Sequence, residues 1–147
     1  MDNALLTALD DFNPAVRAKA LEACAQVPAP PAPSGATRHN LHCHTFFSYN
    51  GYGSSPSRIA VEARQQGWYA AGICDFDVLD AVEEFLAAGD RLGIRATANL
   101  ESRVFFKEYA QHVINSPGEP GIYYFMGAGF IRPPAAGTAP ATQLAEM

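Results

Sequence analysis

Residues 69–100 read YAAGICDFDVLDAVEEFLAAGDRLGIRATANL. The apolar run from Tyr69 to Cys74 predicts one strand, and the run from Ile94 to Leu100 predicts another. Between them, Val78 to Leu92 carries apolar residues at helical spacing, and Gly93 follows where a helix would end. Strand, helix and strand at this spacing predict a βαβ unit, whose strands are parallel and whose crossover is right-handed.

The same alternation continues on both sides of this unit. Upstream, Asn40 to His44 predicts a short strand, and Ser55-Pro56 opens a helix that is expected to reach Gln66. Downstream, a turn-rich loop at 116–121 leads to a fourth predicted strand at Ile122–Met126. The predicted fold class is therefore α/β, with about four βα units in residues 38–130.

The segments that flank residues 38–130 differ from them in composition. Two helices are predicted at 3–11 and 14–26, so residues 1–27 are expected to form an N-terminal helical segment. Residues 28–37 are rich in proline and alanine, which predicts an extended linker. Residues 131–147 contain few large apolar side chains, which predicts a disordered tail.

Composition and charge exclude several classes of partner. The 147 residues are 48% hydrophobic and carry a net charge of −5, which suits a soluble domain and gives no basic surface for nucleic acid or an anionic membrane. No apolar run reaches the ~20 residues of a membrane-spanning helix. The N-terminal residues also lack the basic start of a signal peptide, so a cytoplasmic location is expected.

The three cysteines, Cys24, Cys43 and Cys74, are an odd number and show no CxxC spacing. This pattern argues against a disulfide framework and against a zinc knuckle. We expect reduced thiols, with Cys43 and Cys74 packing as small apolar side chains inside strands.

Polar residues follow each of the three main predicted strands. The first strand ends in His42-x-His44, the second in Asp75-x-Asp77 and the third in Glu101. In parallel α/β folds ligands gather at the carboxyl ends of strands, and side chains two apart on a strand point the same way. Imidazole and carboxylate ligands together favour zinc, manganese or iron. The sequence therefore predicts a metal site at this edge of the sheet.

Structural roles compete with this interpretation. The two histidines could cap a strand or bind loop carbonyls, and Asp77 could be the N-cap of the helix that begins at Val78. Asp75 and Glu101 are harder to explain in this way, because a carboxylate at such a rim is usually met by a cation. His39 and His112 are expected to be ordinary surface histidines.

The stretch from Asn40 to Glu101 resembles the PHP (polymerase and histidinol phosphatase) superfamily. That family begins with a D-x-H-x-H-[TS]-x-x-S-D-G-like motif, continues with an I-T-D-H-D-like motif, and places a glutamate after a third strand. The corresponding runs here are residues 40–51, NLHCHTFFSYNG, residues 73–77, ICDFD, and residues 99–101, NLE. The second run is similar to a PHP subgroup with a CDFD motif.

The resemblance implies the N-terminal portion of a distorted (β/α)7 barrel that hydrolyses a small-molecule phosphoester with metal-activated water. It implies His42, His44, Glu101 and Asp75 as the metal site, where Asp75 would orient a ligand. Asn50, Asp77 and Arg103 are further candidates for contacts to the ligands or the substrate. Arg103, two residues after Glu101, is a candidate phosphate contact, and an exposed salt bridge is the alternative for it. The implied cofactor is a divalent zinc, manganese or iron ion.

A non-catalytic role is the alternative, as a truncated or degenerate PHP-like scaffold or interaction module. Asn50 stands where many family members have aspartate, and Phe76 replaces a ligand histidine. A complete barrel of this kind also needs about 250 residues. An amidohydrolase-like reaction at the same rim is a third hypothesis. An incomplete barrel would expose strand edges, which predicts self-association.

Overall fold

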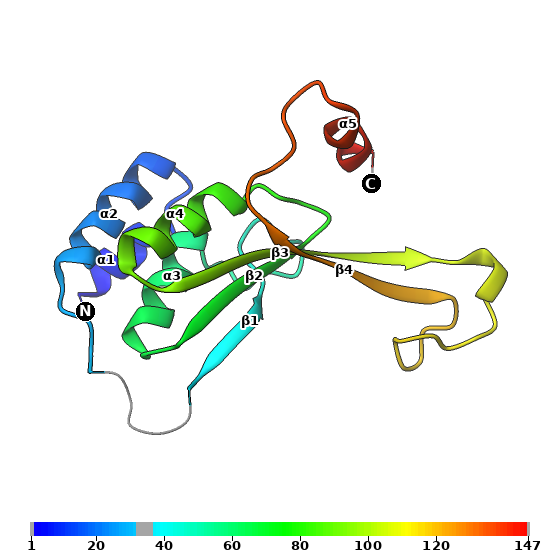
Figure 1. Ribbon diagram of the computed structural model, residues 1–147, viewed down its shortest axis with the longest axis horizontal. Coiled ribbons are helices and arrows are strands. Elements are labelled where there is room, and N and C mark those ends of the chain that lie inside the picture. Colours follow the sequence, from blue (N-terminus) through cyan, green and yellow to red (C-terminus); the bar gives the residue numbers. More distant parts are fainter. Residues whose placement is uncertain (1, 32–36, 147) are drawn as a thin grey trace.

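The computed structural model describes residues 2–31 and 37–146 (Figure 1). In chain order its elements are α1 (Asn3–Leu9), α2 (Pro14–Gln26), β1 (His39–Cys43), α3 (Pro56–Gln65), β2 (Ala70–Phe76), α4 (Val82–Leu92), β3 (Arg95–Phe105), the 3₁₀ turn η1 (Lys107–Tyr109), β4 (Ile122–Phe130) and α5 (Ala139–Ala145). The predicted α/β class is confirmed.

The described strands form one sheet in the order β1-β2-β3-β4. β1, β2 and β3 are parallel, with α3 and α4 as the crossovers between them, so the predicted βαβ units are present. Figure 1 shows α1, α2, α3 and α4 on the same face of the sheet, while the opposite face carries no helix layer there. This arrangement makes two layers, a sheet and the helices that cover one of its sides.

The hydrophobic core lies between these two layers. Ala71 and Ile73 on β2 and Ala98 and Leu100 on β3 point into it, where they meet Phe85 of α4, whose side chain is fully buried. Because side chains alternate along a strand, the residues between them lie on the opposite, open face. The alternation therefore decides which polar residues of β2 and β3 can share a site.

Helix α4 begins later than predicted. The sequence favours a helix from Val78 with Asp77 as its N-cap, but α4 starts at Val82. Asp77 instead has a positive φ of 57°, its amide donates to the Glu101 carbonyl, and its carboxylate accepts from the Ser102 hydroxyl. The predicted cap is wrong because Asp77 bonds across to Glu101 and Ser102 in the middle of β3. The predicted C-terminus is confirmed, since Gly93 adopts the left-handed conformation that ends the helix.

Strand β4 runs antiparallel to β3, so no fourth βα unit is present in the described chain. Both strands are longer than predicted and form a hairpin that extends beyond the body of the sheet (Figure 1). The connection holds η1 and turns rather than a helix that could return the chain to a parallel start. The sheet is open, and the barrel expected from the family resemblance is not confirmed.

The N-terminal helices share the core of the α/β unit. Leu9, Leu21 and Cys24 are buried in the same hydrophobic cluster as the sheet residues. The predicted N-terminal helical segment, residues 1–27, contains α1 and α2, which pack on α3 and α4. The boundaries of the predicted domains otherwise stay predictions.

The chain beyond the sheet is described up to residue 146. Where a disordered tail was predicted, the structure has the short helix α5. Much of the predicted linker at 28–37 lies outside the described residues. No helix in the described part of the chain combines the length and the apolar character that crossing a membrane requires.

Ser55 links the N-terminal helices to α3. Its hydroxyl donates to the Leu9 carbonyl at 2.5 Å and accepts from the amide of Arg58 at 2.9 Å, as the N-cap of α3. We expect Ser55→Ala to lower the free energy of unfolding by about 1–2 kcal/mol, because a buried carbonyl and a helix amide lose their partner. Urea denaturation measures this. Asn13→Ala, which removes only the exposed cap of α2, should cost less, and equal losses would contradict the inter-helix role of Ser55.

Candidate metal centre

Three side chains that the sequence places far apart converge on the open face, at the carboxyl ends of the parallel strands. His42 Nε2 lies 3.0 Å from Glu101 Oε2, and His44 Nε2 lies 3.7 Å from the same oxygen. One ligand atom from each residue lies within 4.8 Å of the other two. These three residues are called the His–Glu cluster below.

The cluster is buried on one side and open on the other. The side chains of Glu101 and His44 are 7% and 14% exposed, whereas that of His42 is 42% exposed. A hollow of about 310 Å³ adjoins His42 on the open face, lined by Leu41, Cys74, Thr97, Asn99, Met126, Gly127 and Ala128. A small ligand could therefore reach the cluster from the His42 side.

A bulge in β1 sets the position of His42. The pairing of β1 with β2 shifts register between Asn40 and Cys43, and the Asn40 side chain accepts from the His42 amide at 3.0 Å. The Leu41 carbonyl leans over Gly72, where an added Cβ would lie 2.7 Å from its oxygen. Asn99 holds that carbonyl by donating to it at 3.1 Å. Glycine at 72 is therefore required for β1 to approach this closely.

The loop at 44–54, called the site loop below, is tied to the end of β2. Both oxygens of Asp75 accept from Thr45, one from its amide and one from its hydroxyl, each at 2.6 Å. The amide of Phe76 donates to the Ser48 hydroxyl at 3.1 Å. These bonds fix the chain immediately after His44.

The structure does not bring Asp75 into the His–Glu cluster. Asp75 has the same parity on β2 as Ile73, so its carboxylate lies on the helix side of the sheet, 2% exposed, and is occupied by Thr45. Burial raises the pKa of Asp75, and the bonds from Thr45 and the nearby His44 oppose this only in part. Its observed contacts orient the site loop.

The other predicted site residues lie outside the cluster. Asn50 accepts from the Ser48 hydroxyl at 2.6 Å, and Asp77 accepts from Ser102. Arg103 forms an exposed salt bridge with Glu119 at 2.5 Å, as the alternative interpretation predicted. His39 and His112 are exposed, in keeping with surface histidines.

Aromatic side chains surround the buried side of the cluster. The ring of Phe76 stacks on that of His44 at 5.3 Å, and the rings of Tyr49 and Tyr124 pack against Phe76. Cys74 is buried nearby, and burial, with the charges of Glu101 and Asp75, raises the pKa of this thiol to about 11. The thiol therefore stays protonated and packs, as predicted.

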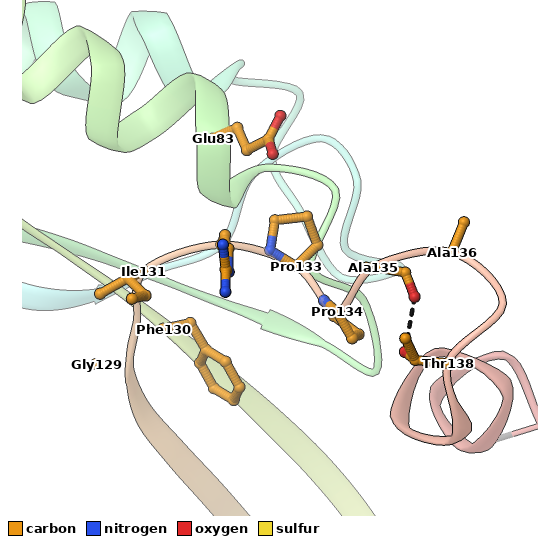
Figure 2. A pocket seen from close by; sticks show the side chains of 10 residues that line it. Glu83, Gly129, Phe130, Ile131, Pro133, Pro134, Ala135, Ala136 and Thr138 are labelled. Carbon is orange, nitrogen blue, oxygen red and sulfur yellow. Dashed lines mark hydrogen bonds between the residues drawn. The ribbon is translucent and has the colours of Figure 1, made fainter.

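A larger hollow lies elsewhere, between the end of β4, the chain that follows it and the start of α4 (Figure 2). It measures about 1000 Å³, and residues 129–136, which include apolar and proline side chains and the charged Arg132, line much of it. Glu83 is the carboxylate among its lining residues. Among the described residues, the side chains that could together hold a metal lie beside His42 and not here, so this hollow offers less chemistry than the smaller one.

The fold and the cluster together define an α/β protein with a His₂Glu centre at the carboxyl edge of a parallel sheet. Two imidazole nitrogens and one carboxylate oxygen are a donor set that divalent zinc accepts, with a coordination position left for water. The buried Glu101 carboxylate also faces imidazoles that are charged only when protonated, so a cation would supply the missing positive charge. The residues fit a divalent metal.

Comparisons with known proteins add little to this description. The chain matches no protein-family model and no curated protein. A crystal structure described as a putative metal-dependent phosphoesterase from Bifidobacterium adolescentis is similar at 23% identity and a TM-score of 0.44. The match covers 55% of this chain and 26% of that one, so the chain spans about a quarter of that protein's length. This similarity is too low to assign a fold family or an activity.

Four residues that shape the centre were not predicted as site residues. Thr45, Ser48, Gly72 and Asn99 hold the site loop and the β1 bulge, and Ser48 also lies 3.5 Å from His44 Nδ1. The sequence contained a signal for Thr45 and Ser48, because both lie within the first motif. Gly72 inside an apolar strand was a general sign of close backbone approach.

Proposed function

We propose that this protein is a metal-dependent hydrolase of the PHP type, acting on a small-molecule phosphoester. The observation that carries the proposal is the convergence of His42, His44 and Glu101, three residues from the first and third motifs, on one point. A metal bound there would polarise the phosphoryl group and lower the pKa of a coordinated water. The identity of the metal, among zinc, manganese and iron, the substrate and a cytoplasmic location stay predictions.

The three residues of the His–Glu cluster would hold the ion from different sides, according to their exposure. Glu101 and His44 are buried and would hold the ion from the sheet side, while the more exposed His42 would hold it from the solvent side. The hollow beside His42 would receive the substrate. Phe76, packed on His44, keeps water from the buried side of the cluster.

A non-catalytic PHP-like module is the second candidate, and the same ring of Phe76 favours it. Phe76 occupies the motif position where the family has a ligand histidine, and its ring fills the space next to His44 without offering a donor atom to a metal. Arg103, the predicted phosphate contact, is engaged by Glu119. Such a module would bind metal without turning over substrate.

Metal content tests the proposal first. We expect the purified full chain to retain or take up zinc or manganese with a defined stoichiometry, and the double variant His42→Ala/His44→Ala to lose it. Elemental analysis after dialysis measures this, and His112→Ala, which removes an exposed histidine away from the cluster, is the matched control. Equal, near-zero metal in the native chain and the double variant would refute the proposal.

Turnover then separates the two candidates. We expect the metal-loaded chain to hydrolyse a generic aryl phosphoester and the isosteric variant Glu101→Gln to lose most of that activity. Amide substrates offered in parallel test the amidohydrolase hypothesis. Metal binding without any turnover would support the non-catalytic module.

A further inference from the structure

We propose that Ser48, with Asn50 behind it, selects the tautomer of His44, placing the ring proton on Nδ1 and leaving Nε2 free to bind metal. This inference rests on the proposed metal site. It assigns a role to two residues of the site loop that do not touch the metal position, and it makes them positioning residues for His44.

The Ser48 hydroxyl has three close polar neighbours. Ser48 Oγ lies 2.6 Å from Asn50 Oδ1, accepts from the Phe76 amide at 3.1 Å, and lies 3.5 Å from His44 Nδ1. Ser48 is 5% exposed, so its hydroxyl is largely removed from bulk water. Two neighbours of fixed character, an acceptor and a donor, and one imidazole nitrogen whose character depends on the tautomer therefore surround a group with a single proton.

The count of donors and acceptors decides where that proton goes. A hydroxyl has one proton and two lone pairs, a carbonyl oxygen only accepts, and an amide N–H only donates. The short contact to Asn50 Oδ1 takes the Ser48 proton, because the contact to His44 is 0.9 Å longer. Toward His44 the hydroxyl can then only accept, which requires the proton on Nδ1.

The consequence appears at the other nitrogen of the ring. In a neutral imidazole with its proton on Nδ1, Nε2 carries the lone pair, and Nε2 is the atom that lies 3.7 Å from Glu101 Oε2. With the opposite tautomer, Nε2 would donate a proton toward Glu101 and could not bind metal. The Ser48 hydroxyl thus keeps Nε2 of His44 unprotonated, and able to bind a metal, in the metal-free chain.

Substitutions at Asn50 and Ser48 test this without altering the cluster. Asn50→Ala removes the acceptor and frees the Ser48 proton for His44, whereas Asn50→Asp keeps an acceptor that cannot donate. Ser48→Ala removes the hydroxyl, and Ser48→Thr restores it. Asn50 is exposed, so its variants keep the test open even if Ser48→Ala fails to fold.

The readout is the tautomer itself, in the metal-free full chain labelled with ¹⁵N. Long-range ¹H–¹⁵N spectra at about pH 8.5, where an ordinary imidazole is neutral, distinguish the two ring nitrogens. We expect Nδ1–H for His44 in the native chain, Asn50→Asp and Ser48→Thr. We expect a shift toward Nε2–H in Asn50→Ala and loss of the preference in Ser48→Ala. His42, whose ring nitrogen faces Glu101, serves as an internal reference.

Zinc affinity supplies the second readout. We expect the dissociation constant to rise about 10-fold in Asn50→Ala and Ser48→Ala, the usual effect of losing a group that orients a ligand, but not in Asn50→Asp or Ser48→Thr. Nε2–H in the native chain, or one unchanged tautomer in all variants, would overturn the inference. The expected tautomers without zinc binding in any variant would instead refute the metal site and leave the tautomer assignment standing.

Discussion

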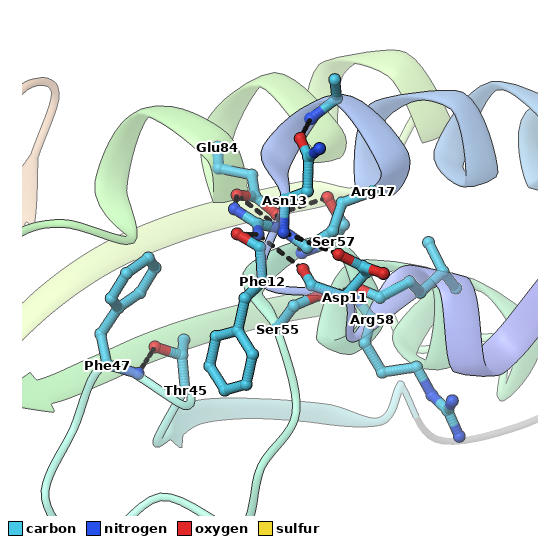
Figure 3. A network of polar contacts seen from close by, with 12 residues as sticks. Asp11, Phe12, Asn13, Arg17, Thr45, Phe47, Ser55, Ser57, Arg58 and Glu84 are labelled. Atoms are coloured by element: carbon cyan, nitrogen blue, oxygen red, sulfur yellow. Dashed lines mark hydrogen bonds and ion pairs between the residues drawn. The ribbon is translucent and has the colours of Figure 1, made fainter.

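Arg17→Ala is expected to lower the free energy of unfolding by about 3–5 kcal/mol, the cost of breaking a buried ion pair from one side. Arg17 is 4% exposed, and its guanidinium donates to both oxygens of Glu84 on α4. It also donates to the carbonyls of Asp11 and Phe12, which join α1 to α2 (Figure 3). The Arg17 guanidinium lies over the ring of Phe46 in the site loop. Removing Arg17 leaves the partly buried Glu84 carboxylate with only its bonds from Ser57, and leaves two backbone carbonyls short of a donor.

The pH dependence of this loss follows from Glu84. Burial acts to raise the pKa of Glu84, but the bonds from Arg17 and Ser57 outweigh it, and the pKa is lowered from 4.5. A carboxylate with a lowered folded pKa contributes stability above its unfolded pKa and loses it as the pH falls through the folded value. We therefore expect the difference between the native chain and Arg17→Ala in urea denaturation to be full at pH 7 and to shrink below about pH 4.5.

A second arginine provides the matched control. Arg91 and Glu22 join the same two helices, α4 and α2, with the same pair of residue types, but both side chains are exposed. Solvent screens such a pair, so Arg91→Ala should leave the unfolding midpoint nearly unchanged. A loss as large as that of Arg17→Ala would show that the contact between the helices, rather than burial of the charge, is responsible.

The network around Arg17 also connects the N-terminal helices to the candidate metal centre. Phe46 stacks on Phe12 at 5.4 Å and is flanked by Arg17, and Phe46 lies two residues after His44 in the chain. Ser55, at the far end of the site loop, is held by Leu9 and Asp10. The loop that carries His44 is therefore fixed at both ends by α1 and α2.

The sequence was informative where local pattern decides the structure. The apolar runs and the glycine at 93 predicted the two βαβ units, because strand and helix periods and C-cap chemistry are local properties. The direction of β4 could not be predicted in the same way. An apolar run identifies a strand, but its direction depends on whether the preceding loop can form a crossover, and residues 106–121 form turns instead.

The residues of the candidate site also differ in how far local pattern could predict them. His42, His44 and Glu101 could be grouped in advance because all three follow strands whose carboxyl ends share one edge. Asp75 was grouped with them because the sequence shows where its strand ends but not on which face of the sheet its side chain lies. The position of one residue along β2 decides the face, and Asp75 shares the face of Ile73, where Thr45 meets it. Contacts made through the backbone, such as the approach of β1 to Gly72, leave only a general sign in the sequence, a glycine inside an apolar strand.

Asp75→Ala is expected to lower the free energy of unfolding by about 2–4 kcal/mol, since two buried donors of Thr45 lose their acceptor. Thr45 is fully buried, so water cannot replace the carboxylate. We also expect weaker zinc binding, because the chain next to His44 is released. Urea denaturation and zinc titration measure the two effects. Asp90→Ala, which removes an exposed carboxylate from α4, should change neither.

Asp75→Asn removes the charge of Asp75 but keeps a side-chain oxygen that can accept a hydrogen bond. The contribution of Asp75 to stability changes with pH in the direction opposite to that of Glu84. Because burial raises the folded pKa of Asp75 above its usual 3.8, the folded chain holds a proton that the unfolded chain has already released. Stability therefore falls as the pH rises from about 3.8 through the folded pKa. Asparagine does not titrate, so the loss caused by Asp75→Asn should be smaller at pH 7 than near pH 4. A loss that grows with pH would mean that the ionised carboxylate is favoured in the fold, and that Thr45 outweighs burial.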